Sequence, residues 1–249
     1  MPTSDMVECM SRIEFFARSE RGLRTHNDDA YCAEQVGDNF LFAVAGSPPG
    51  HLSCEIASRT AIEALKTAVV NRSGSSRDIL IKGVRNADTE VRALSLKSHE
   101  HAGMTTKLVA CLIDTPLECT VLDTGEGNCI VVSGSTIEPA RRFARLRKPH
   151  GSRNGQGIPP PPILSDMISH VLGAPHRLKD MDFSEFSLDD SFLVLGSDGL
   201  TQVLRKEAIA IIIGKNEGNL ETACEEMVKE AMKAGSESTV TVILVHGME

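Results

Sequence analysis

The grouping of apolar segments constrains the fold of this chain most, because short strand-like runs come in series and long helix-like segments come in pairs. The first third predicts three strands, at residues 13–17, 30–36 and 40–45. The Gly37-Asp38-Asn39 turn is predicted to join the last two strands into a hairpin. Apolar residues then recur three or four positions apart over residues 53–70 and 79–94, which predicts two consecutive helices.

The middle and last thirds continue this pattern. Three apolar runs predict consecutive strands of one antiparallel meander, at residues 107–113, 119–122 and 129–132. The remaining segments predict a short helix at 165–172, a strand at 191–196, helices at 202–213 and 220–234, and a strand at 239–245. This order indicates an α+β fold, a four-layer αββα sandwich of two stacked antiparallel sheets with helix pairs on the outer faces. We expect residues 1–249 to form a single domain.

Charge and composition exclude several classes of partner. A net charge of −8 and an aromatic content of 4% argue against nucleic-acid binding, which needs a basic surface and stacking platforms. No run of about 18 apolar residues is present, so we expect no membrane-spanning segment. The first residues do not resemble a signal peptide, and the seven cysteines form no CxxC pair. Together these features predict a cytoplasmic protein with reduced thiols.

A basic, proline-rich segment at residues 139–163 interrupts the series of helices and strands and predicts a long loop. Its first positive side chains are Arg141, Arg142, Arg145, Arg147 and Lys148. Two interpretations stay open at this point. The segment is either a docking loop for an anion or a solvated, flexible part of the surface.

Acidic residues at strand ends and in turns are the main signal for chemistry. Asp28 and Asp29 open a strand, Glu126 lies in a turn between strands, and Asp198 follows a very apolar strand. Carboxylates gathered from several strand ends suit Mg²⁺ or Mn²⁺, which prefer oxygen ligands. Each acid also has a structural interpretation, because short acidic residues are common in turns and at helix N-caps.

Other catalytic motifs do not fit the sequence. Leu195 stands where a G-x-S-x-G nucleophile elbow needs glycine. Gly125-Glu126-Gly127 lies between strands and not before a helix, so it does not form a dinucleotide loop. His99-Glu100-His101 has the composition of a metal grip, but its place at a helix end favours a solvated cap.

Six segments follow one another as the motifs of a known family do. RGLRTHNDDA at 21–30, FAVAGSPPGH at 42–51 and MTT at 104–106 are similar to G-x-x-R-x-x-N-[EQ]-D-A, V-x-D-G-x-G-G-H and G-T-T. GEGN at 125–128, LVLGSDGLT at 193–201 and SESTVTV at 236–242 are similar to G-D-S-R, L-L-x-S-D-G-L-T and D-N-x-T-V. In this order the segments resemble the PPM/PP2C family of metal-dependent protein serine/threonine phosphatases. The resemblance implies a β-sandwich of two antiparallel sheets flanked by helix pairs, in agreement with the pattern above.

The resemblance also implies roles for individual residues. In the family, two Mg²⁺ or Mn²⁺ ions hold a water molecule that attacks phosphorus in line. By similarity Asp198 is a ligand of one ion, and Asp28, in place of a usual Glu, is a ligand of the other. Glu126 matches the position associated with a third, weaker ion, and Arg24 matches the phosphate-binding arginine.

Two ligand positions of the family lack a carboxylate in this chain. Gly46 stands at the position whose aspartate bridges both ions, and Ser238 stands at that of a terminal aspartate. A bridging carboxylate offsets repulsion between two dications and sets their roughly 3.5–4 Å spacing. The sequence therefore predicts no preformed two-metal centre, although Glu237, Asp123 and Glu126 are candidate substitutes.

The leading hypothesis is a pseudophosphatase that binds a phosphorylated or regulatory protein in signalling without hydrolysing it. Arg24 and the basic segment would supply the anion contacts, since guanidinium groups hold phosphate bidentately. No tightly bound cofactor is expected. The alternative is an active or weak protein serine/threonine phosphatase that uses Mg²⁺ or Mn²⁺ at Asp28, Asp198 and Glu126.

Overall fold

Two five-stranded antiparallel sheets form the centre of the molecule in the computed structural model, which describes residues 12–47, 53–114, 116–124, 128–140, 171–174, 181–216 and 218–248. The first sheet has the strand order β1-β10-β9-β6-β7 and the second has the order β2-β3-β4-β5-β8. The first sheet consists of β1 (Arg12–Glu20), β10 (Val240–Met248), β9 (Ser191–Gly196), β6 (Cys129–Ser133) and β7 (Thr136–Pro139). The second consists of β2 (Ala30–Val36), β3 (Asn39–Gly46), β4 (Lys107–Asp114), β5 (Glu118–Asp123) and β8 (Asp182–Ser187).

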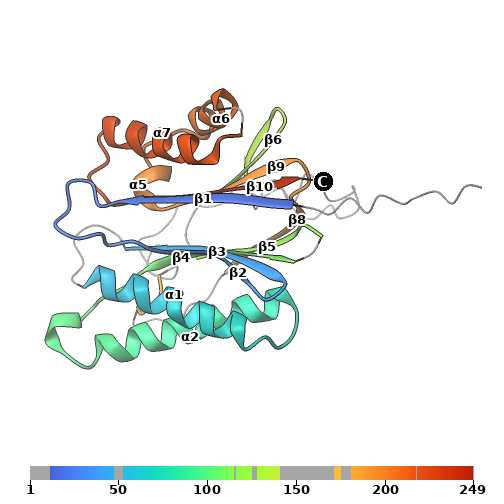
Figure 1. Ribbon diagram of the computed structural model, residues 1–249. Coiled ribbons are helices and arrows are strands. Elements are labelled where there is room, and N and C mark those ends of the chain that lie inside the picture. Colours follow the sequence, from blue (N-terminus) through green and yellow to red (C-terminus); the bar gives the residue numbers. More distant parts are fainter. Residues whose placement is uncertain are drawn as a thin grey trace, which may run out of the picture.

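Helices cover the outer face of each sheet, so the molecule has four layers (Figure 1). The helices α1 (Cys54–Val70) and α2 (Ser76–Ser95) lie against the second sheet, and a short 3-10 turn, His99–His101, follows them. Among the described residues, the outer face of the first sheet carries α5 (Asp198–Thr201), α6 (Lys206–Lys215) and α7 (Leu220–Lys233). The predicted α+β sandwich of two antiparallel sheets with helices outside is confirmed.

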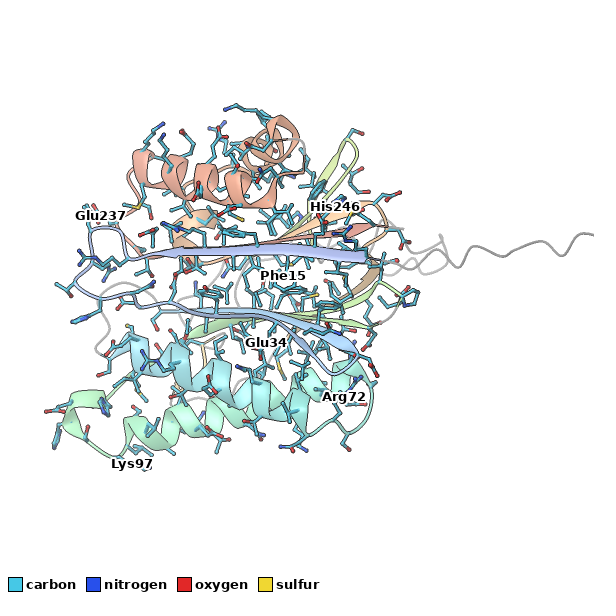
Figure 2. The ribbon with its side chains drawn as sticks, in the orientation of Figure 1. Phe15, Glu34, Arg72, Lys97, Glu237 and His246 are labelled. Atoms are coloured by element: carbon cyan, nitrogen blue, oxygen red, sulfur yellow. The ribbon has the colours of Figure 1, made fainter. Side chains whose placement is uncertain are left out.

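Of the four apolar clusters among the described residues, three join one layer to the next. One lies between the two sheets and includes Phe42, Cys111 and Leu195, and Figure 2 shows Phe15 at the edge of the same layer. The second cluster packs α1 and α2 against the second sheet. The third packs α5, α6 and α7 against the first sheet. Strand β4 is buried on both faces, because alternate residues enter the first and second clusters. This double burial explains why its sequence is one continuous apolar run.

Most predicted elements lie where the sequence places them. The hairpin of β2 and β3 turns at Gly37, whose φ of 64° lies in the left-handed region that suits glycine. Both paired helices of the first third are present, and α2 begins with a capping box made by Ser75 and Asp78. The final helix and the final strand are also confirmed, with ends within a few residues of the predicted ones.

Four expectations about elements need correction or fall outside the described chain. The three-strand meander is wrong, because β4 pairs with β5 but β6 crosses to the other sheet and pairs with β9. The predicted helix at 202–213 begins later than expected, because α6 starts at Lys206 after the extended N-cap residue Arg205. Of the predicted helix at 165–172, Leu172 forms an isolated bridge with Thr106, and residues 165–170 lie outside the described ranges. Of the loop predicted at 139–163, Pro139 belongs to β7, and residues 141–163 lie outside the described ranges.

Candidate functional site

Several predicted site residues meet at one end of the sandwich. Gly46 at the end of β3 stands directly opposite Lys107 at the start of β4, in antiparallel register. Asp198 begins α5 two residues after β9 ends, and Asn128 directly precedes β6. A small open pocket lies between these strand ends, lined by Val44, Gly46, Lys107, Asn128, Gly196, Ser197 and Asp198.

Asp198 is held on both of its carboxylate oxygens by groups of this chain. The ammonium of Lys107 donates to Oδ2 at 2.8 Å, and the amide of Asn128 donates to Oδ1 at 3.3 Å. The hydroxyl of Thr201 donates to the amide oxygen of Asn128 at 3.0 Å and so orients that amide. The Lys107 and Asp198 side chains are 25% and 19% exposed, so this ion pair is partly shielded from water.

Asp28, which the resemblance makes a metal ligand, forms an ion pair with Arg24. The guanidinium Nη1 of Arg24 is 3.6 Å from Oδ2 of Asp28. Its Nε donates to the backbone carbonyl of Glu237 at 3.1 Å. Figure 2 places Glu237 at the end of the sandwich opposite Arg72, which locates Arg24 at the end where the loops of both sheets meet.

Asp29 is the acidic group that sequence reasoning passed over in favour of Asp28. Its Oδ2 accepts from the hydroxyl of Thr241 at 2.7 Å, and its amide donates to Oδ1 of Asn27 at 3.1 Å. Burial of the carboxylate raises the pKa of Asp29 to about 6, and the charge of Asp198 adds to this increase. Hydrogen bonds from Thr241 and Ser197 oppose it.

The carboxylate of Asp29 fills the space beside Gly46. A Cβ atom at Gly46 would lie 2.5 Å from Oδ1 of Asp29, which is closer than such atoms approach in proteins. An aspartate at position 46 would therefore require Asp29 to move away from its bond to Thr241. The missing side chain at Gly46 and the inward position of Asp29 depend on each other.

Ser238 lies in the turn before β10, and this turn packs closely against α5. A Cβ atom at Gly199 would lie 2.1 Å from the carbonyl oxygen of Thr239, so only glycine fits there. The hydroxyl of Ser197 donates to the same carbonyl at 3.2 Å and accepts from the amide of Thr241 at 3.0 Å. The segment resembling the SDGL motif thus serves to join β9 to β10.

Other residues singled out in the sequence lie outside the described chain. These are Glu126 and the basic residues Arg141, Arg142, Arg145, Arg147 and Lys148. Of the candidate substitutes, Asp123 accepts from the amide of Asn128 at 3.2 Å, and Glu237 is exposed.

The acidic side chains that the structure describes at this site are already engaged by other groups of the chain. Within the described ranges, no three acidic, histidine or cysteine side chains are grouped so as to hold a metal ion. Each of the three neighbouring carboxylates already accepts from or pairs with a donor of this chain: Asp28 with Arg24, Asp29 with Thr241, and Asp198 with Lys107. Two cationic side chains in this set offset most of the negative charge that would attract a pair of dications.

Sequence reasoning missed three members of the site: Asp29, Lys107 and Asn128. A signal existed for Lys107, since it is the one charged residue at the start of an otherwise apolar strand and directly follows the segment resembling G-T-T. Asp29 had a signal in the same motif, because it stands at the aspartate of N-[EQ]-D-A, directly after Asp28. For Asn128 the sequence offers only its place after the glycine turn.

Comparisons with known proteins agree with this architecture. The sequence model of Protein phosphatase 2C matches residues 177–240, which include Asp198. A bacterial serine phosphatase has a TM-score of 0.77 with this chain, covering 96% of this chain and 98% of its own, at 21% sequence identity. The chain has the protein phosphatase 2C fold. No curated protein matches it in sequence.

Two further structures with the PP2C fold are similar over almost their whole length. The S. agalactiae serine/threonine phosphatase has a TM-score of 0.74 and 19% identity, covering 94% of this chain and 99% of its own. The catalytic domain of the serine threonine protein phosphatase PstP, solved in complex with two manganese ions, has a TM-score of 0.73 and 20% identity. That pair covers 96% of this chain and 100% of the PstP domain.

Proposed function

We propose that this chain is a pseudophosphatase, a PP2C-fold domain that binds a phosphorylated or regulatory protein in signalling and does not hydrolyse the phosphate ester. The ion pair of Lys107 and Asp198 carries this proposal, because it places a fixed positive charge on a carboxylate that an active two-metal centre would need. The absence of a side chain at Gly46 supports it, since a bridging carboxylate sets the spacing of two metal ions.

Arg24 is the residue through which we expect a phosphate to bind. Its side chain is 27% exposed, and its Nη1 lies 3.6 Å from Asp28, which is a charge contact longer than a hydrogen bond. The preceding Arg21 donates to the backbone carbonyls of Arg24 and Thr25 and so holds this segment in place. A guanidinium held by its Nε to Glu237 keeps two further nitrogen atoms for a bidentate contact with phosphate.

The same proposal includes the expected cellular location, the role of the basic segment and the single domain. A cytoplasmic location is supported by six buried cysteines that carry free thiols. Within the described ranges, no helix combines the length and apolar character needed to cross a membrane. The contribution of the basic segment at 141–148 to anion binding, and a single domain over 1–249, stay predictions.

Phosphate release tests whether the domain hydrolyses its ligand. With p-nitrophenyl phosphate or a phosphoserine peptide in millimolar Mn²⁺, we expect the chain to release phosphate no faster than its Asp198→Ala variant. The reason is that Asp198 is engaged by Lys107 and Asn128 in the resting protein. Robust, EDTA-sensitive release that disappears in Asp198→Ala would refute the pseudophosphatase.

Binding of the same phosphoserine peptide tests the positive half of the proposal. Arg24→Ala is expected to weaken the peptide affinity about tenfold, in the range of one charge-assisted hydrogen-bond pair. Arg12→Ala is the matched control, since Arg12 forms an exposed ion pair with Glu14 at the far end of β1. Equal affinity of the Arg24→Ala and Arg12→Ala variants would show that Arg24 does not hold the phosphate.

An active enzyme is the second candidate, and one observation favours it. The PP2C-fold domain of PstP was solved with two manganese ions, and this chain has three carboxylates, Asp28, Asp29 and Asp198, at one end of its sheets. An active enzyme would have to displace Lys107 from Asp198 when metal binds. The phosphate-release experiment distinguishes the two candidates directly.

A further inference from the structure

The charge at the pocket between the strand ends comes from an unusual source. The negative charge of Asp198 is balanced by Lys107, the first residue of β4, where a bound cation could otherwise balance it. We infer that Lys107 is a built-in counter-cation for Asp198, and that removal of its charge opens a divalent-cation site at this carboxylate. This inference goes beyond the proposed function, since it concerns the cation at the pocket whatever protein the domain binds.

The contacts of Asp198 show how completely the chain satisfies it. Oδ2 accepts from Lys107 at 2.8 Å and Oδ1 accepts from Asn128 at 3.3 Å. Thr201, one turn along α5, fixes the amide of Asn128 with a 3.0 Å hydrogen bond. A divalent ion that approached either oxygen would have to break one of these bonds and lie next to an ammonium group. Like charges at such a distance repel strongly when water is partly excluded.

The sheet register fixes Lys107 at this position. Lys107 is paired with Gly46 across β3 and β4, so the backbone of the lysine cannot drift from the pocket without loss of the ladder. Directly opposed residues in an antiparallel pair project from the same face of the sheet, and glycine leaves that face open on the β3 side. The long lysine side chain can therefore reach across to Asp198.

A comparison within the molecule separates this pair from an ordinary surface ion pair. Lys66 on α1 lies 3.1 Å from Glu34 on β2, with side chains that are 32% and 43% exposed. The two lysines have similar exposure, but Glu34 is more open to water than Asp198, which is 19% exposed. Lys66→Ala thus removes an ion-paired lysine of the same kind outside the pocket and serves as the matched control.

Calorimetric titration with MnCl₂ tests the inference on the full chain. We expect wild type and Lys66→Ala to show no saturable Mn²⁺ site in the millimolar range. Lys107→Ala should gain one Mn²⁺ site with a Kd at least about tenfold below any wild-type value, and its Tm should rise with added Mn²⁺. The double variant Lys107→Ala/Asp198→Ala should lose that site, which locates the ion at Asp198.

Lys107→Met keeps most of the side-chain length without the charge, and so guards against a packing defect in Lys107→Ala. The inference is overturned if wild type binds Mn²⁺ as tightly as the Lys107 variants, or if neither folded Lys107 variant binds it. These readouts are independent of hydrolysis. A wild type that binds Mn²⁺ without releasing phosphate would contradict this inference alone, whereas phosphate release contradicts the proposed function.

Discussion

At the scale of single residues, the site is a set of mutually dependent substitutions. Gly46 has no side chain, Asp29 takes the adjacent space, and Lys107 supplies charge to Asp198. Asp29 is partly buried and accepts a hydrogen bond from Thr241. The hydrogen bond from Thr241 offsets part of the cost of taking this carboxylate out of water.

The pKa of Asp29, raised by burial to about 6, makes a prediction about stability and pH. The folded protein binds a proton on Asp29 more readily than the unfolded chain does, so ionised Asp29 destabilises the fold. Its contribution is most favourable below about pH 4 and is lost as the pH rises through 6. The difference in unfolding free energy between wild type and Asp29→Asn should therefore shift against wild type by up to about 3 kcal/mol between pH 4 and 7.

Urea unfolding at a series of pH values measures this difference. Thr241→Val provides a second reading, because it removes the hydrogen bond that favours the ionised form of Asp29. In that variant the pH window should move upward. A wild type and Asp29→Asn pair whose free-energy difference stays constant over this pH range would contradict the assignment.

At the scale of elements, strand register and the first turn of α5 fix where the residues of the site lie. The register of β3 with β4 sets Gly46 against Lys107, and the close approach of Gly199 to Thr239 anchors α5 beside β10. On the opposite face, α2 begins with a reciprocal cap: the Ser75 hydroxyl accepts from the amide of Asp78, and the Asp78 carboxylate accepts from the amide of Ser75.

The Ser75 cap leads to a prediction about helix stability. Ser75→Ala removes the acceptor for the Asp78 amide and should lower the free energy of unfolding by about 1 kcal/mol. Ser73, exposed in the same connection between α1 and α2, is the control, and Ser73→Ala should change it by less than about 0.5 kcal/mol. Equal urea midpoints for the two variants would mean that the cap contributes nothing measurable.

At the scale of the whole molecule, the layer between the sheets determines whether the two halves of the site meet. Gly46 and Lys107 belong to one sheet, whereas Thr241 lies in β10 of the other sheet and Asp198 begins α5 just after β9 of that sheet. The ion pair of Lys107 and Asp198 and the hydrogen bond of Asp29 and Thr241 both cross between the sheets. The site is thus assembled only when the central cluster is packed.

Leu195 tests that central layer. It is fully buried in β9, and Leu195→Ala should cost about 2–5 kcal/mol of unfolding free energy through lost burial and a residual cavity. Ile211, 68% exposed on α6, is the control, and Ile211→Ala should change the free energy by less than about 0.5 kcal/mol. Similar losses in both variants, measured by urea unfolding, would contradict the described packing.

The errors in predicting elements have a common physical cause. Strand β6 reads as a strand in sequence, but Cys129 and Val131 enter one cluster while Ile130 and Val132 enter another. A run buried on both faces fits either sheet, so its sequence carries no signal for its neighbours. The helix predicted at 202–213 is present as α6, but its start was placed too early, because Val203 and Leu204 pack on the same cluster as Ile209 without being helical.

The sequence by itself determined most of the helices and strands, the α+β class, the order of the family-like segments and the glycine and serine at positions 46 and 238, because periodicity and residue identity are local properties. Only the tertiary structure decided which strands share a sheet and which charged groups meet. Lys107 and Asp198 are 91 positions apart, and Asp29 and Thr241 are 212 apart. Contacts over such separations follow from the stacking of two sheets, which no local pattern encodes.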